Sequence, residues 1–85
     1  MNWQKDTEGK FNQMLAKIPI FLRDMAKNKV SKKAEALAAK EGRAEVTEKD
    51  VVDAFFLETP FGFHGPMKAD MEAMGINYQR YGYER

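Results

Sequence analysis

The chain has 85 residues and no cysteine, which excludes a disulfide framework, a thiolate zinc site, an iron–sulfur cluster and a cysteine nucleophile. Its apolar runs are far shorter than the ~20 residues that a helix needs to span a bilayer. The N-terminus also lacks the basic-then-apolar pattern of a signal peptide. We therefore expect a cytoplasmic protein that makes no contact with a membrane.

Motifs that carry chemistry are also scarce. The one histidine, His64, has no identifiable Ser/Asp pair, as a hydrolytic triad would require. No glycine-rich phosphate loop, metal-ligand cluster or EF-hand spacing occurs. The sequence therefore predicts no catalytic residue, no metal site and no cofactor bound by motifs of its own.

What is present describes one globular domain, residues 1–85, with an uneven charge. Residues 1–46 carry ten basic and six acidic side chains, whereas residues 47–85 carry four basic and seven acidic ones. Such asymmetry either steers an acidic partner toward one end or lets two helices attract each other.

Capping signals divide the chain into helices. Pro19 suits a first helical turn, Gly42 suits the left-handed residue after a helix, and Thr47 with Asp50 forms a short capping box. The pattern predicts an all-α fold, a small bundle of three to four helices with an aromatic C-terminal tail. The expected helices cover about residues 7–17, 19–41, 47–58 and 66–74.

The central helix is expected to present a narrow apolar stripe made largely of alanine. Because alanine lets partner helices approach closely, the bulk of the core must come from neighbouring helices. The stripe consists of Ala26, Val30, Ala34, Leu37 and Ala38, and the expected neighbours are Phe55, Phe56 and Leu57.

Arg23 falls on the apolar side of this helix, with Lys27 one turn further along. A guanidinium beside a hydrophobic face needs a partner. Either it pairs with Asp53 or Glu58 of the next helix, or it clamps an anionic ligand with its two-pronged geometry.

The lysines of the central helix are a candidate site for binding nucleic acid. No aromatic residue is interleaved with them, and the acidic third helix would repel phosphates, so we expect a solvated face and no nucleic-acid partner. They are Lys27, Lys29, Lys32 and Lys33.

The C-terminal third offers two further candidates. His64 directly follows Phe63 and lies three residues after Phe61, so this segment is either an aromatic turn that covers the core or, with a nearby methionine, a metal or haem ligand. The tail carries Tyr78, Arg80 and Tyr81, and it either packs onto its own domain or docks onto another chain.

The motif Ile18-Pro19-x-Phe21-x-Arg23, a helix ending at Gly42, and a helix capped by Thr47 resemble a known small domain. It is the C-terminal domain of the B subunit of light-independent protochlorophyllide reductase, which also occurs as a stand-alone protein. Trp3 fits the same pattern, so the resemblance covers residues 3–56 and leaves 60–85 as an addition.

The resemblance implies a non-catalytic accessory module that docks onto reductase subunits or another protein, or helps to enclose a tetrapyrrole. The residues expected to bind the ligand or partner are Phe21, Arg23, Lys27, His64, Tyr78, Arg80 and Tyr81.

An alternative is a histone-like module for DNA binding or dimerisation. The run Arg43-x-x-Val46-Thr47-x-x-Asp50-Val51-Val52-x-Ala54 is similar to the segment that joins the last two helices of a histone fold. The central helix is shorter than that of a histone fold, and the acidic third helix offers DNA little to bind.

Overall fold

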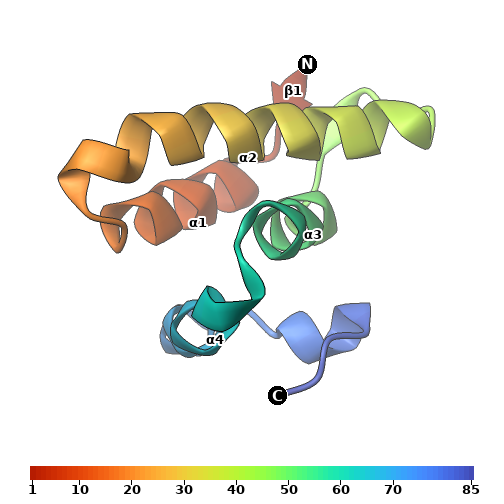
Figure 1. Ribbon diagram of the computed structural model, residues 1–85. Coiled ribbons are helices and arrows are strands. Elements are labelled where there is room, and N and C mark those ends of the chain that lie inside the picture. The colour runs from red at the N-terminus through yellow and green to blue at the C-terminus, as the bar shows by residue number, and fades with distance from the viewer.

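The structure of the protein is a computed structural model that describes all residues, 1–85. It contains four α-helices, so the expectation of an all-α bundle is confirmed (Figure 1). In chain order the elements are β1 (Asn2–Trp3), α1 (Lys5–Ala16), α2 (Ile20–Lys40), β2 (Glu45–Val46), α3 (Glu48–Glu58), the 3₁₀ turn η1 (Phe61–Phe63), α4 (His64–Ala73) and the 3₁₀ turn η2 (Tyr78–Tyr81).

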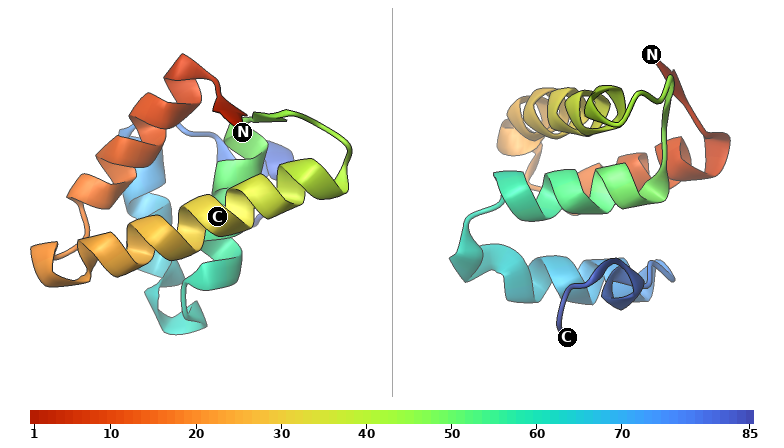
Figure 2. Two further views of the ribbon diagram at one scale, coloured as in Figure 1. Left: turned by 90° about the horizontal axis from the view of Figure 1, so that it is seen from above. Right: turned by 90° about the vertical axis from the view of Figure 1, so that its right-hand side faces the viewer.

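The helices are arranged around α3. Figures 1 and 2 show α1 and α2 on one side of α3, and α4 with the C-terminal tail on the opposite side. The contact between α2 and α3 is the most extensive one between two elements. Because alanines line the inner side of α2, the two helices can approach closely.

The predicted capping signals explain the helix ends. Thr47 and Asp50 form the capping box at the start of α3, where the Thr47 amide donates to Asp50 Oδ2 at 2.9 Å. Gly42 follows α2 with a φ of 75°, a left-handed conformation that favours glycine. Pro19 lies one residue outside α2 as its N-cap, not within its first turn, and α1 begins at Lys5, earlier than predicted.

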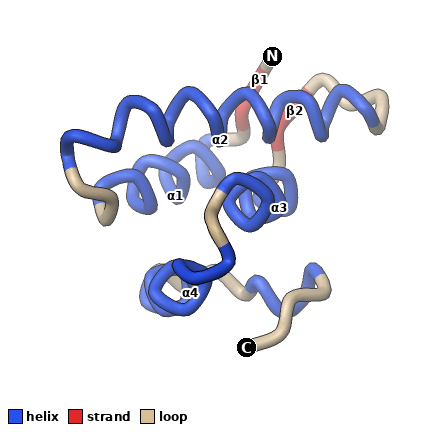
Figure 3. Tube along the Cα trace, viewed as in Figure 1, coloured by secondary structure: helices blue, strands red, loops and turns tan.

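A feature that the sequence analysis did not predict is a two-stranded parallel sheet (Figure 3). Asn2 pairs with Glu45 and Trp3 with Val46. The pairing ties the N-terminus to the connection between α2 and α3. Trp3 thereby lies over the core, 5.0 Å from Phe11 between ring centroids, and its Nε1 donates to Glu35 at 2.9 Å. Trp3 therefore covers the core with its ring, and its indole N–H has a partner.

The core contains most of the side chains that the apolar pattern indicated. Val30, Ala34 and Ala38 of α2 are buried, and Phe55 and Phe56 of α3 supply the bulk.

Three aromatic or aliphatic side chains differ from expectation. Leu57 is 60% exposed because it lies on the outer side of α3. Phe61 and Phe63 were expected to cover the core but are 87% and 65% exposed. The reason is that α4 begins at His64, two residues earlier than predicted, and packs through Met67 and Met71, which leaves the preceding turn outside.

Candidate docking surface

Arg23 fixes the corner between α1 and α2. Its Nε donates to the carbonyl of Leu15 at 3.0 Å, and its Nη2 donates to the carbonyls of Ile18 at 3.0 Å and Ala16 at 3.3 Å. The last carbonyls of a helix have no partner within the helix, so the guanidinium caps the C-terminus of α1.

This cap corrects the expectation of an ion pair between Arg23 and the third helix. The Asp53 carboxylate accepts instead from Lys49, at 2.7 Å, and from Tyr83. Two of the three guanidinium nitrogens of Arg23 are committed to backbone carbonyls. Arg23 therefore positions the corner. Only the N–H groups that make no bond to these carbonyls could bind an anion.

The corner holds a group of apolar side chains in solvent. Ile20 is 78% exposed, Phe21 82%, Met25 53% and Leu22 38%. We call these four residues the α2 corner. They occupy the first two turns of α2, before the buried side chains of this helix begin at Val30.

Lysines follow immediately along α2, with Lys29 and Lys32 on its outer side and Lys27 on the side of Arg23. Lys27, Lys29 and Lys32 are exposed, as expected for a solvated face. A depression of about 390 Å³ lies beside them. Its lining residues are Lys29, Lys32, Lys33, Ala36 and, from α3, Glu58.

The tail is packed onto its own domain. Tyr78 is buried and donates to Glu72 at 2.5 Å, and Tyr81 donates to Glu48 at 2.7 Å. Tyr83 stacks on Phe56 with ring centroids 3.9 Å apart. Burial and the hydrogen bond to Glu48 raise the pKa of Tyr81 to about 12.

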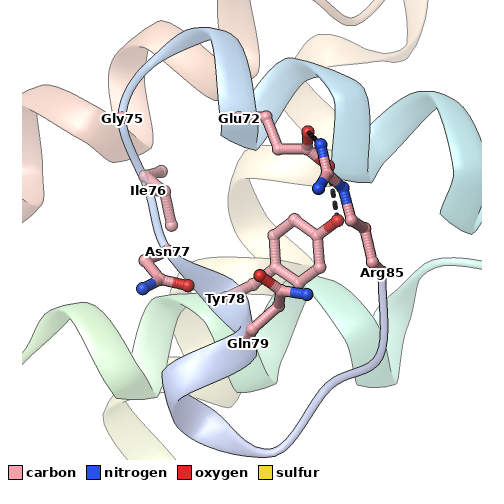
Figure 4. A pocket seen from close by; sticks show the side chains of 7 residues that line it. All are labelled: Glu72, Gly75, Ile76, Asn77, Tyr78, Gln79 and Arg85. Atoms are coloured by element: carbon pink, nitrogen blue, oxygen red, sulfur yellow. Dashed lines mark hydrogen bonds and ion pairs between the residues drawn. The ribbon is translucent and has the colours of Figure 1, made fainter.

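A second hollow of about 290 Å³ lies between the end of α4 and the tail (Figure 4). Its polar groups already contact one another, because Glu72 accepts from both Tyr78 and Arg85. Arg80 is exposed and lies 5.5 Å from the ring centroid of Tyr81.

His64 is the first residue of α4. Its Nε2 donates to the Thr59 carbonyl at 2.9 Å, and its ring lies 5.1 Å from that of Phe56 and 5.4 Å from that of Phe61. No group of three or more His, Cys, Asp or Glu side chains is placed to hold a metal ion.

The sequence analysis did not predict the ion pair between Arg43 and Asp50, although both residues belong to the histone-like run. Arg43 donates to both oxygens of the Asp50 carboxylate, at 2.6 and 2.7 Å, and also to Glu41. Burial opposes ionisation of Asp50, but the hydrogen bonds from Arg43 and Thr47 hold its pKa below the ordinary value. The signal in the sequence was an Arg that precedes a capping-box Asp by seven residues.

The seven candidate binding residues therefore do not form one site. Phe21, Arg23 and Lys27 lie at the start of α2, His64 at the start of α4, and the tail residues in η2. Figures 1 and 2 place α2 and η2 on opposite sides of α3. Exposed apolar side chains occur both at the α2 corner and beside His64, and the α2 corner carries four of them and is followed by lysines that make no ion pair.

A family model described as "Protein of unknown function (DUF2621)" matches residues 1–84. No match to the protochlorophyllide reductase domain accompanies it, so the resemblance to that domain is wrong. The resemblance rested on Trp3, on the short motif from Ile18 to Arg23 and on helix-capping residues, and any helix–turn–helix can share such capping residues. Comparison with curated proteins and with solved structures gave no significant match. None of the four helices combines the length and the apolar character that a membrane span requires.

Proposed function

The chain belongs to the family described as a protein of unknown function (DUF2621), and we propose that it is a non-catalytic binding module that docks through the α2 corner. The observation that carries the proposal is the exposure of Ile20 and Phe21, at 78% and 82%. A cytoplasmic location, expected from the sequence, is part of the proposal.

Holding these side chains in water is unfavourable, because contiguous apolar surface on a monomer favours association. The structure nevertheless presents them on a well-anchored corner, since the three hydrogen bonds of Arg23 join the two helices there. A rigid surface loses less conformational entropy on binding than a flexible one. Both features support a docking role for the corner.

Site-specific photo-crosslinking in the source cells tests the proposal. A benzophenone amino acid would replace Phe21 in one variant and Phe61 in another, and adducts would be identified by mass spectrometry. Phe61 is the matched control, because it is equally exposed but lies on η1. We expect a reproducible adduct, with protein or lipid, at position 21 alone. Equal labelling at both positions, or none at position 21, would overturn the proposal.

The enclosure of a tetrapyrrole and docking onto reductase subunits were expected from the resemblance that proved wrong. They form no part of this proposal. The direct check is a titration with protochlorophyllide or haem that follows the fluorescence of Trp3.

A second candidate is the histone-like dimer, which the bidentate pair between Arg43 and Asp50 favours because it joins two residues of the histone-like run. Light scattering coupled to gel filtration would show a dimer of about twice the 9.8 kDa chain mass. A DNA mobility shift that weakens steeply with salt would support the nucleic-acid version. A monomer that shifts no DNA at low salt would remove this candidate.

A further inference from the structure

The outer side of α2 carries both an apolar end and a row of cations that make no ion pair. Resting on the docking role proposed above, we infer that this side binds an anionic membrane surface. In this arrangement α2 lies along the phospholipid headgroups, and the α2 corner dips into the apolar boundary beneath them.

Helical geometry places the relevant residues on one face. At 100° per residue, Phe21, Met25, Lys29, Lys32 and Ala36 lie within one outward sector of α2. The opposite sector carries the side chains that pack on the core, Val30, Ala34 and Ala38. Figures 1 and 2 show that no other helix crosses the outer side of α2. The N-terminal half of α2 is therefore free to lie on a flat surface, while β1 and the N-terminus rise beside its C-terminal half.

The charge of this region complements an anionic surface. Residues 17–40 contain seven basic and two acidic side chains, whereas the rest of the chain contains seven basic and eleven acidic ones. The cations of the five ion pairs are Lys10, Arg43, Lys49 and Arg85, none of which lies in α2. The lysines of α2 are thus uncommitted, and three of them line the depression described above.

A lipid surface fits both halves of this face. Phosphate groups attract a row of lysines, and the acyl boundary takes up exposed Phe and Met side chains, as for amphipathic helices that lie in an interface. Nucleic acid would pair with the lysines but would leave Phe21 and Met25 in water. The expectation of no membrane contact came from the lack of a spanning run, and lying on a surface requires none.

Co-sedimentation of the full chain with vesicles tests the inference. One vesicle population contains phosphatidylglycerol and phosphatidylcholine, and the other contains phosphatidylcholine alone. We expect binding to the anionic vesicles only, weakened at least tenfold between about 0.05 and 0.5 M NaCl, since salt screens the attraction. Phe21→Ser should weaken it about tenfold, because the variant loses the insertion of one aromatic ring.

Two matched controls separate this face from general effects. Phe61→Ser removes an equally exposed ring from η1 and should leave binding unchanged. The pair Lys29→Glu with Lys32→Glu should reduce binding about a hundredfold, whereas Lys5→Glu with Arg80→Glu makes the same charge change elsewhere and should reduce it much less. All substituted side chains are exposed, so circular dichroism should confirm an unchanged fold.

The lipid assignment is overturned if anionic vesicles fail to bind at low salt, if neutral vesicles bind equally well, or if the control variants lose as much as the α2 variants. The crosslinking result then separates the two proposals. A protein adduct at position 21 without vesicle binding would leave the docking role intact and reject the lipid. No adduct at position 21 and no vesicle binding would reject both.

Discussion

The α2 corner and the C-terminal tail use similar apolar side chains in opposite ways. In the tail, Tyr78, Tyr81 and Tyr83 each donate to a carboxylate, and Tyr83 stacks on Phe56. At the corner, Phe21 and Ile20 contact mainly water, and the neighbouring lysines make no ion pair. An aromatic residue in a terminal segment is thus no sign of a free surface. The two regions differ because the aromatic side chains of the tail already have partners within the domain, whereas Phe21 at the corner is exposed to water.

The largest expected effect on the free energy of unfolding is at Phe56, the ring that the tail covers. Phe56→Ala removes a buried ring that contacts His64, Tyr78 and Tyr83. It should lower the free energy of unfolding by about 3–5 kcal/mol, measured by urea denaturation, because it leaves a cavity beneath the tail. A loss below about 1 kcal/mol would show that the tail does not depend on this contact.

The next effect concerns the ion pair that starts α3. Asp50→Asn should cost about 2 kcal/mol, because it weakens both the capping box and the bidentate bond from Arg43.

The same variant should alter the acid limb of stability. The folded-state pKa of Asp50 is depressed, so its contribution is complete above the ordinary Asp pKa of about 3.9 and is lost as pH falls from there through the folded value. Urea titrations below pH 5 should therefore show a flatter decline for Asp50→Asn than for the wild type. Parallel declines would contradict the assigned role.

A smaller effect is expected at alkaline pH. The folded-state pKa of Tyr81, about 12, lies above the unfolded value of about 10. The unfolded chain therefore loses this proton first as pH rises, and stability should fall between about pH 10 and 12. Tyr81→Phe should remove that part of the decline, seen in urea denaturation across this range, while Tyr78 and Tyr83 still titrate.

The smallest expected effect on the free energy of unfolding is at the α2 corner. Phe21→Ser should change the free energy of unfolding by no more than about 0.5 kcal/mol, since the ring is exposed and packs on nothing that folding requires. Urea denaturation beside Phe56→Ala would measure the contrast directly. A loss as large as that of Phe56→Ala would mean that the corner is core, and the docking proposal would then fail.

The amino-acid sequence by itself determined the helical architecture. Alanine, lysine and glutamate favour helix locally, Gly42 ends α2, and the Thr47–Asp50 box starts α3, so neighbours in the chain decide these features. The burial of Val30, Ala34 and Ala38 followed from the same local period.

Only the tertiary structure decided which side chains remain free. The parallel pairing of Trp3 with Val46, the capping of α1 by Arg23 and the docking of three tyrosines all join elements whose relative placement local propensity does not specify. Hydrophobicity alone ranks Phe21, Phe56 and Phe61 equally. Their burial differs because α4 and the tail cover the ring of Phe56, whereas no element covers the other two rings.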